Sequence, residues 1–275
     1  MSPGGAEGRS VGRPDLRDPV GVFDSGVGGL SILRHLRQEL PGEDLLYVAD
    51  SAEVPYGKKG VAFVRARALA LAEFLFARGA KALVVACNTA TAAAIATLRE
   101  RYPWPVIGVE PALKPAATQS TGVVAVLATE GTLASEKFGA LLDRWGRAVE
   151  VIVAPCPGWV EQVERGELDG EATRRLVERE VAPLLARGVD TLVLGCTHYP
   201  FLTKVIREVA GPAVAILEPG EAVARQLRRR LEAVGLLSDA VSGGREAFFT
   251  SGDPLAVAEV VRRLWAPGAS VERLD

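Results

Sequence analysis

The sequence predicts an α/β protein made of two similar, pseudo-symmetric domains, each a mostly parallel sheet covered by helices. Short aliphatic runs alternate with amphipathic stretches along almost the whole chain, which is typical of parallel strands joined by helices. One strand–loop–helix phrase also occurs twice. The segments ARGAKALVVACNTAT (residues 77–91) and ARGVDTLVLGCTHYP (residues 186–200) carry Ala, Arg, Gly, Leu, Val and Cys at matching positions. This repetition predicts two units of the same kind.

The expected strands are continuous apolar runs, which indicates that both faces of each strand are buried. In chain order they are VGVFD (20–24), DLLYVAD (44–50), KALVVAC (81–87), PVIGV (105–109), GVVAVLA (122–128), VEVIVA (149–154), DTLVLGC (190–196) and AVAILE (213–218). In such folds ligands bind beyond the carboxyl ends of the strands, so the residues that follow each strand are the candidates for a site.

The expected helices lie between these strands. Residues 60–79 and 170–188 are amphipathic, and each ends at a glycine suited to a left-handed stop, Gly79 or Gly188. After the first cysteine, Asn88 or Thr89 is the expected N-cap of the next helix. After the second, Pro200 suits a first helical turn and Gly211 the end of that helix. Residues 253–265 are expected to form a last helix, capped by Asp253.

Composition excludes several classes of function. The 275 residues are 48% hydrophobic and 24% charged, with a net charge of −2, so nothing favours nucleic acid or an anionic membrane as partner. No apolar run approaches the roughly 20 residues that span a bilayer. Residues 1–18 contain no apolar signal segment and are predicted to be a mobile tail of a cytoplasmic protein. Three cysteines and two histidines cannot build a disulfide framework or a histidine-rich metal site, so neither a metal nor a cofactor is expected.

Cys87 and Cys196 end the two copies of the repeated phrase. A single cysteine at a strand end is more often a small buried residue, and Cys156, which has no matching partner, is predicted to be one. Two at equivalent strand ends, each followed by polar residues, favour a functional site. A nearby helix N-terminus is expected to lower the pKa of each thiol. Two thiols on opposite walls of a cleft could then remove a proton from one face of a carbon atom and return one to the other face, which is a two-base racemisation.

Two further loops follow expected strands. GVFDSGVGG has glycines at positions 26, 28 and 29, and Ser31 breaks the GxGxxG dinucleotide pattern. This loop could present backbone N–H groups to a carboxylate, or it could be only a tight turn into a helix with Asp24 as its cap. VPYG is expected to be a rigid turn with a partly buried Tyr56. His198, two residues after Cys196, could titrate beside that thiol.

Together these motifs resemble the glutamate racemase family within the aspartate/glutamate racemase superfamily. GVFDSGVGGLSIL, VPYG, ACNTAT, PVIGVEPALKPA, ATEGT and LGCTHYP occur in the family's order over roughly residues 20–220. The resemblance implies a cofactor-independent interconversion of L- and D-glutamate that supplies D-glutamate for peptidoglycan in the bacterial cell wall. It assigns Cys87 to the D-isomer and Cys196 to the L-isomer as bases, assisted by Asp24, His198 and Glu164.

The resemblance also implies a set of substrate contacts and a domain organisation. The substrate-binding residues would be Asp24, Ser25, Tyr56, Gly57, Asn88, Thr89, Thr132, Thr197 and His198. Residues 19–111 plus 218–275 would form one domain and residues 112–217 the other, with the active site in the cleft between them, and the protein would be a homodimer. No arginine occurs in the cysteine, DSG or PYG motifs. The substrate carboxylates are therefore expected to be held by backbone N–H groups and by the hydroxyls of Ser25, Thr89 and Thr197.

Three alternatives remain at this stage. The chain could racemise aspartate or another acidic amino acid. It could be a hydrolase that uses Cys196 as nucleophile and His198 as base, which would leave Cys87 without a role. It could also be a two-domain sensor that binds an amino acid without exchanging its α-proton.

Overall fold

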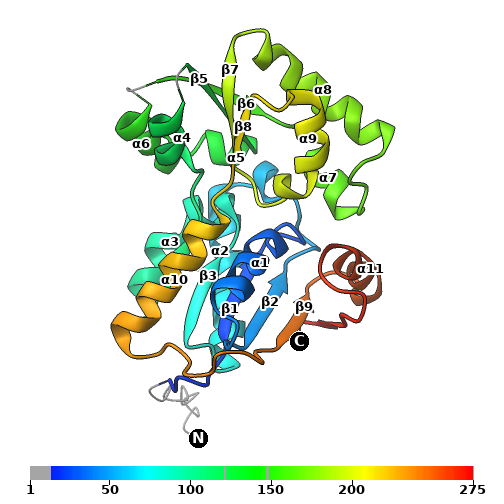
Figure 1. The fold of residues 1–275 in the computed structure, drawn as a ribbon. Helices are drawn as coiled ribbons and strands as arrows, with labels where there is room; N and C mark the ends of the chain where they lie inside the picture. The colour runs from blue at the N-terminus through cyan, green and yellow to red at the C-terminus, as the bar shows by residue number, and fades with distance from the viewer. Residues whose placement is uncertain (1–13, 121, 147–148, 275) are drawn as a thin grey trace, which may run out of the picture.

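The computed structural model describes residues 14–120, 122–146 and 149–274, which contain two parallel sheets lying one above the other (Figure 1). The first sheet has the strand order β10-β9-β2-β1-β3-β4, and the second has the order β6-β5-β7-β8. All neighbouring strands are parallel. The predicted α/β class with two parallel-sheet domains is confirmed.

The first sheet is built from both ends of the chain. Its strands are β1 (Val20–Asp24), β2 (Leu45–Ala49), β3 (Ala82–Val85), β4 (Val106–Gly108), β9 (Glu246–Thr250) and β10 (Val271–Arg273). On one face lie α1 (Leu30–Glu39), α10 (Gly220–Val234) and α11 (Pro254–Leu264), and on the other α2 (Val61–Ala77) and α3 (Asn88–Arg101). These elements, with the short helical turn η1 (Tyr56–Lys58), are called the first domain.

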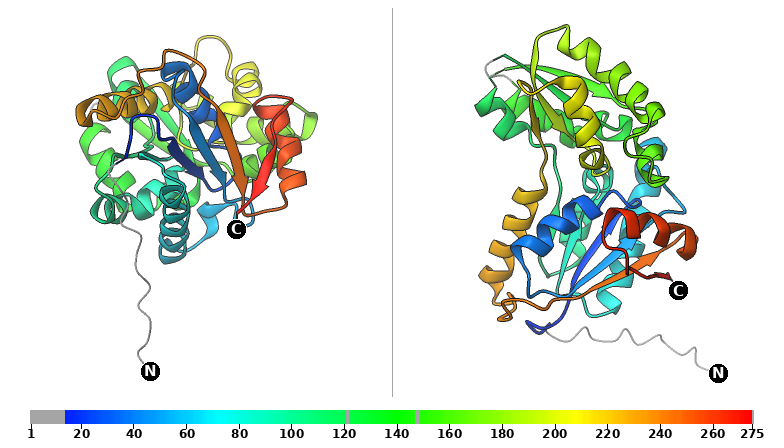
Figure 2. Two further views of the ribbon diagram at one scale, coloured as in Figure 1. Left: turned by 90° about the horizontal axis from the view of Figure 1, so that it is seen from below. Right: turned by 45° about the vertical axis from the view of Figure 1, so that its right-hand side comes forward.

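The second sheet lies between these two parts of the chain. Its strands are β5 (Val123–Ala128), β6 (Glu150–Pro155), β7 (Val189–Leu194) and β8 (Ala215–Leu217). One face packs on α4 (Leu113–Gln119) and α6 (Glu136–Trp145), the other on α7 (Trp159–Glu164), α8 (Glu171–Leu185) and α9 (Thr203–Ala210). With α5 (Glu130–Leu133) and η2 (Tyr199–Leu202) they form the second domain. The side view in Figure 2 separates the two domains clearly.

The two sheets share an order of strands. The order β2-β1-β3-β4 in the first domain matches β6-β5-β7-β8 in the second, so β3 and β7 occupy equivalent positions. These are the strands of the repeated phrase, and in each copy the preceding glycine has the expected left-handed conformation, with φ of 84° at Gly79 and 80° at Gly188. Each strand ends two residues before its cysteine, at Val85 or Leu194, so each thiol lies in the loop beyond the strand.

All eight expected strands are present, and two more extend the first sheet beyond β2. These are β9 and β10, which the sequence patterns did not indicate. Glu246–Thr250 is a short run whose first two residues are only partly buried, and Val271–Arg273 is a largely exposed edge strand. Neither has the continuous apolar character that identified the other strands. The last helix does begin where predicted, because the Asp253 carboxylate accepts the Leu255 N–H at 3.0 Å.

The described part of the predicted 1–18 tail is attached to the first domain. Residues 15–18 form a turn in which the Asp15 N–H donates to the Asp18 carboxylate at 2.7 Å. The carbonyl of Leu16 accepts a hydrogen bond from the buried ammonium group of Lys81. Residues 1–13 lie outside the described residues. No helix within the described ranges is long and apolar enough to cross a membrane.

Candidate active site

The carboxyl ends of the strands in both domains face one another across a cavity. Its walls come from both domains. The cavity has a volume of about 280 Å³, including its opening to solvent. It is lined by Ser25, Tyr56, Gly57, Cys87, Asn88, Thr89, Thr132, Cys196, Thr197 and His198, and also by Pro55, Thr129 and Val160. Of the sequence-predicted site residues, only Asp24 and Glu164 lie behind this wall, where they contact residues that form it.

Cys87 lies at the start of α3, and its thiol is the N-cap of that helix. The N–H of Ala90 donates to Cys87 Sγ at 3.4 Å, and Ser25 Oγ lies 3.8 Å from the same sulfur. The prediction that Asn88 or Thr89 caps this helix is wrong, because the helix already begins at Asn88 and the thiol accepts the free N–H. The catalytic candidate is therefore held by the helix that follows it.

The expectation that the pKa of Cys87 is lowered is wrong, because other effects outweigh the helix N-terminus. Burial raises the pKa of this thiol well above its ordinary value, and the nearby carboxylate of Asp24 raises it further. The hydrogen bonds with Ala90 and Ser25 act in the opposite direction but are weaker effects. At neutral pH Cys87 therefore carries its proton, which suits it to donate a proton to a carbanion.

Cys196 lies beside a chain of titratable groups in the second domain. His198 Nδ1 is 3.7 Å from Cys196 Sγ, and His198 Nε2 is 2.7 Å from Oε1 of Glu164. Burial alone would lower the pKa of His198, but its hydrogen bonds with the thiol and the carboxylate raise that pKa well above 6.5. A protonated imidazole in this position can donate a hydrogen bond to the sulfur or pass it a proton.

The glycine-rich loop brings the two domains together at this chain. The N–H of Val27 donates to Glu164 Oε1 at 2.8 Å. A Cβ atom on Gly26 would lie 1.9 Å from that oxygen, and one on Gly28 would lie 2.3 Å from His198 Nδ1. A side chain at either glycine would therefore displace Glu164 or His198 from the position it holds against this loop.

The expectation that Asp24 caps the helix after this loop is wrong, because Gly29 is the N-cap residue of α1 and no side chain of the described residues caps that helix. The backbone N–H groups of the loop do bind carboxylates, but these belong to Glu164 and Asp24 of the protein itself. Asp24 is fully buried and accepts the Gly29 N–H at 2.6 Å, near the start of α1, and the Thr197 hydroxyl at 3.2 Å. Burial raises the pKa of Asp24, while the charge of His198 and the backbone N–H groups oppose that shift. Asp24 thus connects the glycine-rich loop of the first domain with the loop of the second domain that carries Cys196.

A cluster of hydroxyl groups forms another part of the cavity wall. Thr89 Oγ1 lies 3.0 Å from Thr129 Oγ1 and 3.1 Å from Thr132 Oγ1, and the last two are 3.1 Å apart. The sequence patterns did not single out Thr129. Thr129 could have been predicted as a site residue because it directly follows a predicted strand, as the cysteine loop follows β3. The neighbouring Asn88 is 4% exposed, and neither atom of its side-chain amide has a hydrogen-bond partner among the described residues.

Tyr56 is more buried than its motif suggested, at 1% exposed. Its hydroxyl donates to Asp50, which also accepts two hydrogen bonds from Arg67 at 2.9 and 2.5 Å. Burial would raise the pKa of Asp50, but the hydrogen bonds, led by those from Arg67, lower it. Asp50 was not among the predicted site residues, although it follows β2 in the same way that Ser25 follows β1. This ion pair holds the tyrosine against the cavity.

The chemistry of the cavity wall is that of thiols, hydroxyls, an amide and one imidazole. Neither lysine nor arginine is among the residues that line it. Within the described ranges, no group of three or more His, Cys, Asp or Glu residues could hold a metal ion. The wall can therefore donate hydrogen bonds to an anionic ligand and exchange protons with it at two sulfur atoms.

Comparison with known proteins also points to proton exchange, because the chain is similar to amino-acid racemases. A sequence model of the Asp/Glu/Hydantoin racemase family matches residues 21–227. The chain is 59% identical to the glutamate racemase of Methylococcus capsulatus over 251 residues, which cover 91% of this chain and 92% of that protein. It is 40% identical to the Thermus thermophilus glutamate racemase crystallised with beta-chloro-D-alanine, with a TM-score of 0.81 and coverage of 95% and 98% of the two chains.

An Escherichia coli glutamate racemase, crystallised with L-glutamate and the activator UDP-MurNAc-ala, is 32% identical with a TM-score of 0.83. That match covers 94% of this chain and 98% of the other. The family match spans both copies of the repeated phrase, and the structural matches span both domains. The chain therefore belongs to the Asp/Glu/Hydantoin racemase family.

Proposed function

We propose that this protein interconverts L- and D-glutamate without a cofactor, with the thiols of Cys87 and Cys196 as the two bases. The observation that carries the proposal is that two buried thiols, one from each domain, line the same small cavity. Glutamate is favoured as substrate because relatives that match nearly the whole chain are named glutamate racemases. The E. coli relative was crystallised with L-glutamate.

In the proposed reaction, the thiolate of one cysteine takes the α-proton and forms an S–H bond. The electron pair of the broken C–H bond stays on the α-carbon and is delocalised into the α-carboxylate. The thiol of the other cysteine then donates its proton to the opposite face and becomes a thiolate. For L-glutamate, Cys196 would act first as base, and Cys87, whose pKa is raised by burial, would supply the proton. D-glutamate would require the reverse protonation states.

The surrounding residues have distinct proposed tasks. His198, held by Glu164, would exchange a proton or a hydrogen bond with Cys196, and Asp24 and Ser25 would act on the side of Cys87. Because the cavity wall contains no cationic side chain from lysine or arginine, neutral donors would bind the substrate carboxylates. The unpaired amide of Asn88 and the cluster of threonine hydroxyls are suited to this, as are Ser25 and Thr197.

A cysteine hydrolase is the competing function, and one observation favours it. Cys196, His198 and Glu164 form a chain of sulfur, imidazole and carboxylate like that of an activated nucleophile. That function gives no task to Cys87, although this thiol lines the same cavity. The racemase uses both sulfur atoms and is therefore preferred.

The deciding experiment follows the α-proton of glutamate in D₂O with purified protein and no pyridoxal phosphate. Cys87→Ser and Cys196→Ser are compared with wild type, and Cys156→Ser serves as the matched control because its buried sulfur does not line this cavity. We expect deuterium incorporation with inversion in wild type and in Cys156→Ser, and loss of inversion in the other two variants. Full activity in Cys87→Ser would instead support single-cysteine chemistry, and binding without exchange would support a sensor.

The substrate class and biological role have tests of their own. Glutamate should turn over much faster than aspartate when both are assayed side by side, and the opposite preference would assign the chain to aspartate. We further propose that the product D-glutamate supplies peptidoglycan synthesis, so the gene should restore growth of bacteria that require D-glutamate. The proposed homodimer should appear in sedimentation as twice the chain mass of 29.1 kDa.

A further inference from the structure

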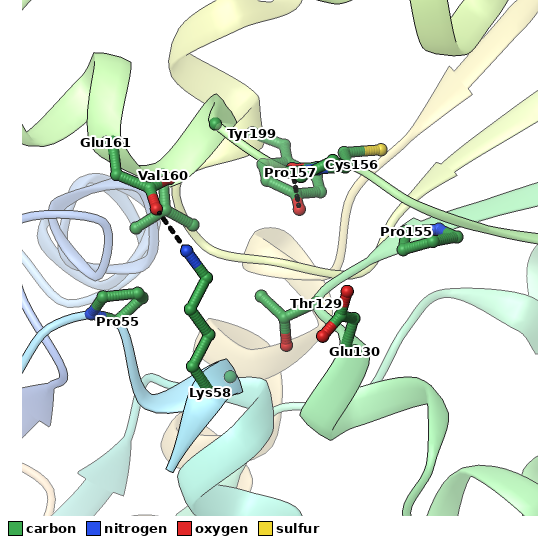
Figure 3. A pocket seen from close by; sticks show the side chains of 12 residues that line it. Pro55, Lys58, Thr129, Glu130, Pro155, Cys156, Pro157, Val160, Glu161 and Tyr199 are labelled. Carbon is green, nitrogen blue, oxygen red and sulfur yellow. Dashed lines mark hydrogen bonds and ion pairs between the residues drawn. The ribbon is translucent and has the colours of Figure 1, made fainter.

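A second pocket adjoins the active-site cavity (Figure 3). Pro55, Gly57, Thr129 and Val160 line both spaces, so the two share walls from both domains. The pocket encloses about 390 Å³, including its opening to solvent. Much of its remaining wall is apolar, formed by prolines and by Tyr199.

The charged residues of this pocket are few. Lys58 is the one cation among the lining residues, and Glu130 and Glu161 are the carboxylates. Lys58 Nζ lies 3.0 Å from Glu161 Oε1, and this ion pair reaches from η1 of the first domain to α7 of the second. Figure 3 shows the lysine side chain extending across the pocket toward Glu161. The side chains are 65% and 35% exposed, so the pair lies at the solvent side.

These charges matter for an anionic substrate. The whole chain has a net charge of −2 and so does not attract an anion from a distance, and the active-site cavity has no lysine or arginine in its wall. A glutamate ion, with its two carboxylates, would meet two protein carboxylates at this pocket. Lys58 is placed to offset them.

We propose that this pocket is the entrance for a dicarboxylate substrate and that Lys58 admits it, first by neutralising Glu161 and then by offering its ammonium group to the substrate. The proposal rests on the proposed function. Exposed ion pairs are weak, so Lys58 can exchange one carboxylate partner for another at little cost. The substrate carboxylate is chemically the same partner as the Glu161 side chain.

The test compares variants that change the charge at the entrance. Lys58→Gln makes it more negative by one charge, Glu161→Gln makes it less negative by one, and the double variant has the charge of the wild type. At about 0.01 M ionic strength, where charges act over about 30 Å, we expect Lys58→Gln to lower kcat/KM for glutamate by about threefold to tenfold. The loss should lie mainly in KM. Glu161→Gln should equal or exceed wild type, and the double variant should lie between Lys58→Gln and wild type, because it restores the charge of the entrance but lacks the ammonium group.

Controls and salt separate steering from damage to the fold. Lys204 and Asp169 form a comparable exposed pair at 3.4 Å that does not line the pocket, so Lys204→Gln and Asp169→Asn should behave as wild type. At about 1 M salt, where the screening length falls to about 3 Å, all variants should converge. Wild-type kcat/KM in Lys58→Gln at low salt would overturn the proposal, as would a loss that persists undiminished at high salt.

The association rate of D-glutamate, measured by stopped-flow tryptophan fluorescence, keeps this proposal separate from the proposed reaction. Slower association in Lys58→Gln would support the entrance even if the wild-type protein proved unable to racemise glutamate, and only the reaction would then be refuted. If the protein is an active racemase and Lys58→Gln associates with D-glutamate as fast as wild type, the proposed entrance is refuted and the proposed reaction is not.

Discussion

Asn88 and Thr91 lie within one turn of α3 and are both buried polar residues, but within the part of the chain that the structure describes only Thr91 has hydrogen-bond partners for its side chain. Thr91 is satisfied, since its hydroxyl donates to the carbonyl of Val85 and accepts the N–H of Val109, both at 3.1 Å. Asn88 has no such partner among the described residues, although its side chain is almost fully buried. Leaving a buried polar group unpaired costs about 1–3 kcal/mol. A ligand that hydrogen-bonds to the Asn88 amide would remove this cost, which is why we propose this residue for substrate binding.

Asn88→Ala should therefore separate stability from activity. We expect its free energy of unfolding in urea to equal that of wild type or exceed it by up to about 1–3 kcal/mol, because the unpaired amide is gone. Its KM for glutamate should rise about tenfold or more, as expected when a hydrogen bond to a charged group is lost. Thr91→Val is the matched control and should lose stability. A large loss of stability in Asn88→Ala with unchanged KM would show that the amide is structural.

His198 gives a pH-dependent prediction. Its pKa in the folded protein is raised, so its protonated form adds stability fully below pH about 6.5, its ordinary value, and that contribution is lost as the pH rises through the raised pKa. The difference in unfolding free energy between wild type and His198→Gln should thus shrink on going from pH 6 to alkaline pH. Denaturant titrations at several pH values measure it, and a difference that grows with pH would contradict the assignment of charge.

At the scale of elements, α3 ties the proposed chemistry to a helix terminus. The sulfur of Cys87 replaces the oxygen that usually caps a helix, and the N–H of Ala90 points at it. Cys196 has no equivalent task, because the turn that follows it begins at Tyr199, with His198 as its N-cap residue. The two loops therefore differ in structure although their strands are equivalent.

This difference predicts how substitutions of the two cysteines affect stability. Serine is a strong N-cap, so Cys87→Ser should unfold at about the same denaturant concentration as wild type, whereas Cys87→Ala should lose about 1 kcal/mol. Both should be inactive as racemases. At position 196, serine and alanine should differ less, since no cap is removed. Equal stability of Cys87→Ser and Cys87→Ala would mean that the thiol does not stabilise α3.

At the scale of the whole molecule, the cavity is where the two domains meet. Polar contacts cross between them around it, including Thr197 to Asp24, Val27 to Glu164 and Thr89 to Thr129. A substrate in the cavity would touch both domains and would therefore bind the folded arrangement in which they face each other. Ligand binding should accordingly stabilise the whole molecule and not one domain alone.

Substrate should raise the thermal midpoint of unfolding. At one hundred times its Kd, a ligand that binds only the folded state adds about 2.7 kcal/mol, which for a chain of this size corresponds to about 5–10 °C. Differential scanning fluorimetry with D-glutamate, against sodium chloride at equal ionic strength, measures the shift in a single transition. A midpoint unchanged by saturating glutamate, or two transitions of which only one moves, would contradict this picture.

The sequence by itself determined the architecture and the equivalence of the two strands that precede the cysteines. Strand and helix periodicity is local, so the eight apolar strands, the glycine stops at Gly79 and Gly188 and the cap at Asp253 were all predictable. The repeated phrase also predicted that each thiol lies at the carboxyl edge of its sheet, because in parallel α/β domains the residues that follow the strands meet at that edge.

Only the tertiary structure decided the burial, the pKa values and the contact partners of these residues. The raised pKa of Cys87 comes from burial and from Asp24, a residue on another strand. Thr129 joins the cavity, and Lys58 meets Glu161, only because the two domains face each other. The two added strands likewise depend on an available sheet edge and not on their own apolar character. Charge, burial and partners arise from contacts between residues far apart in the chain, and local patterns do not contain them.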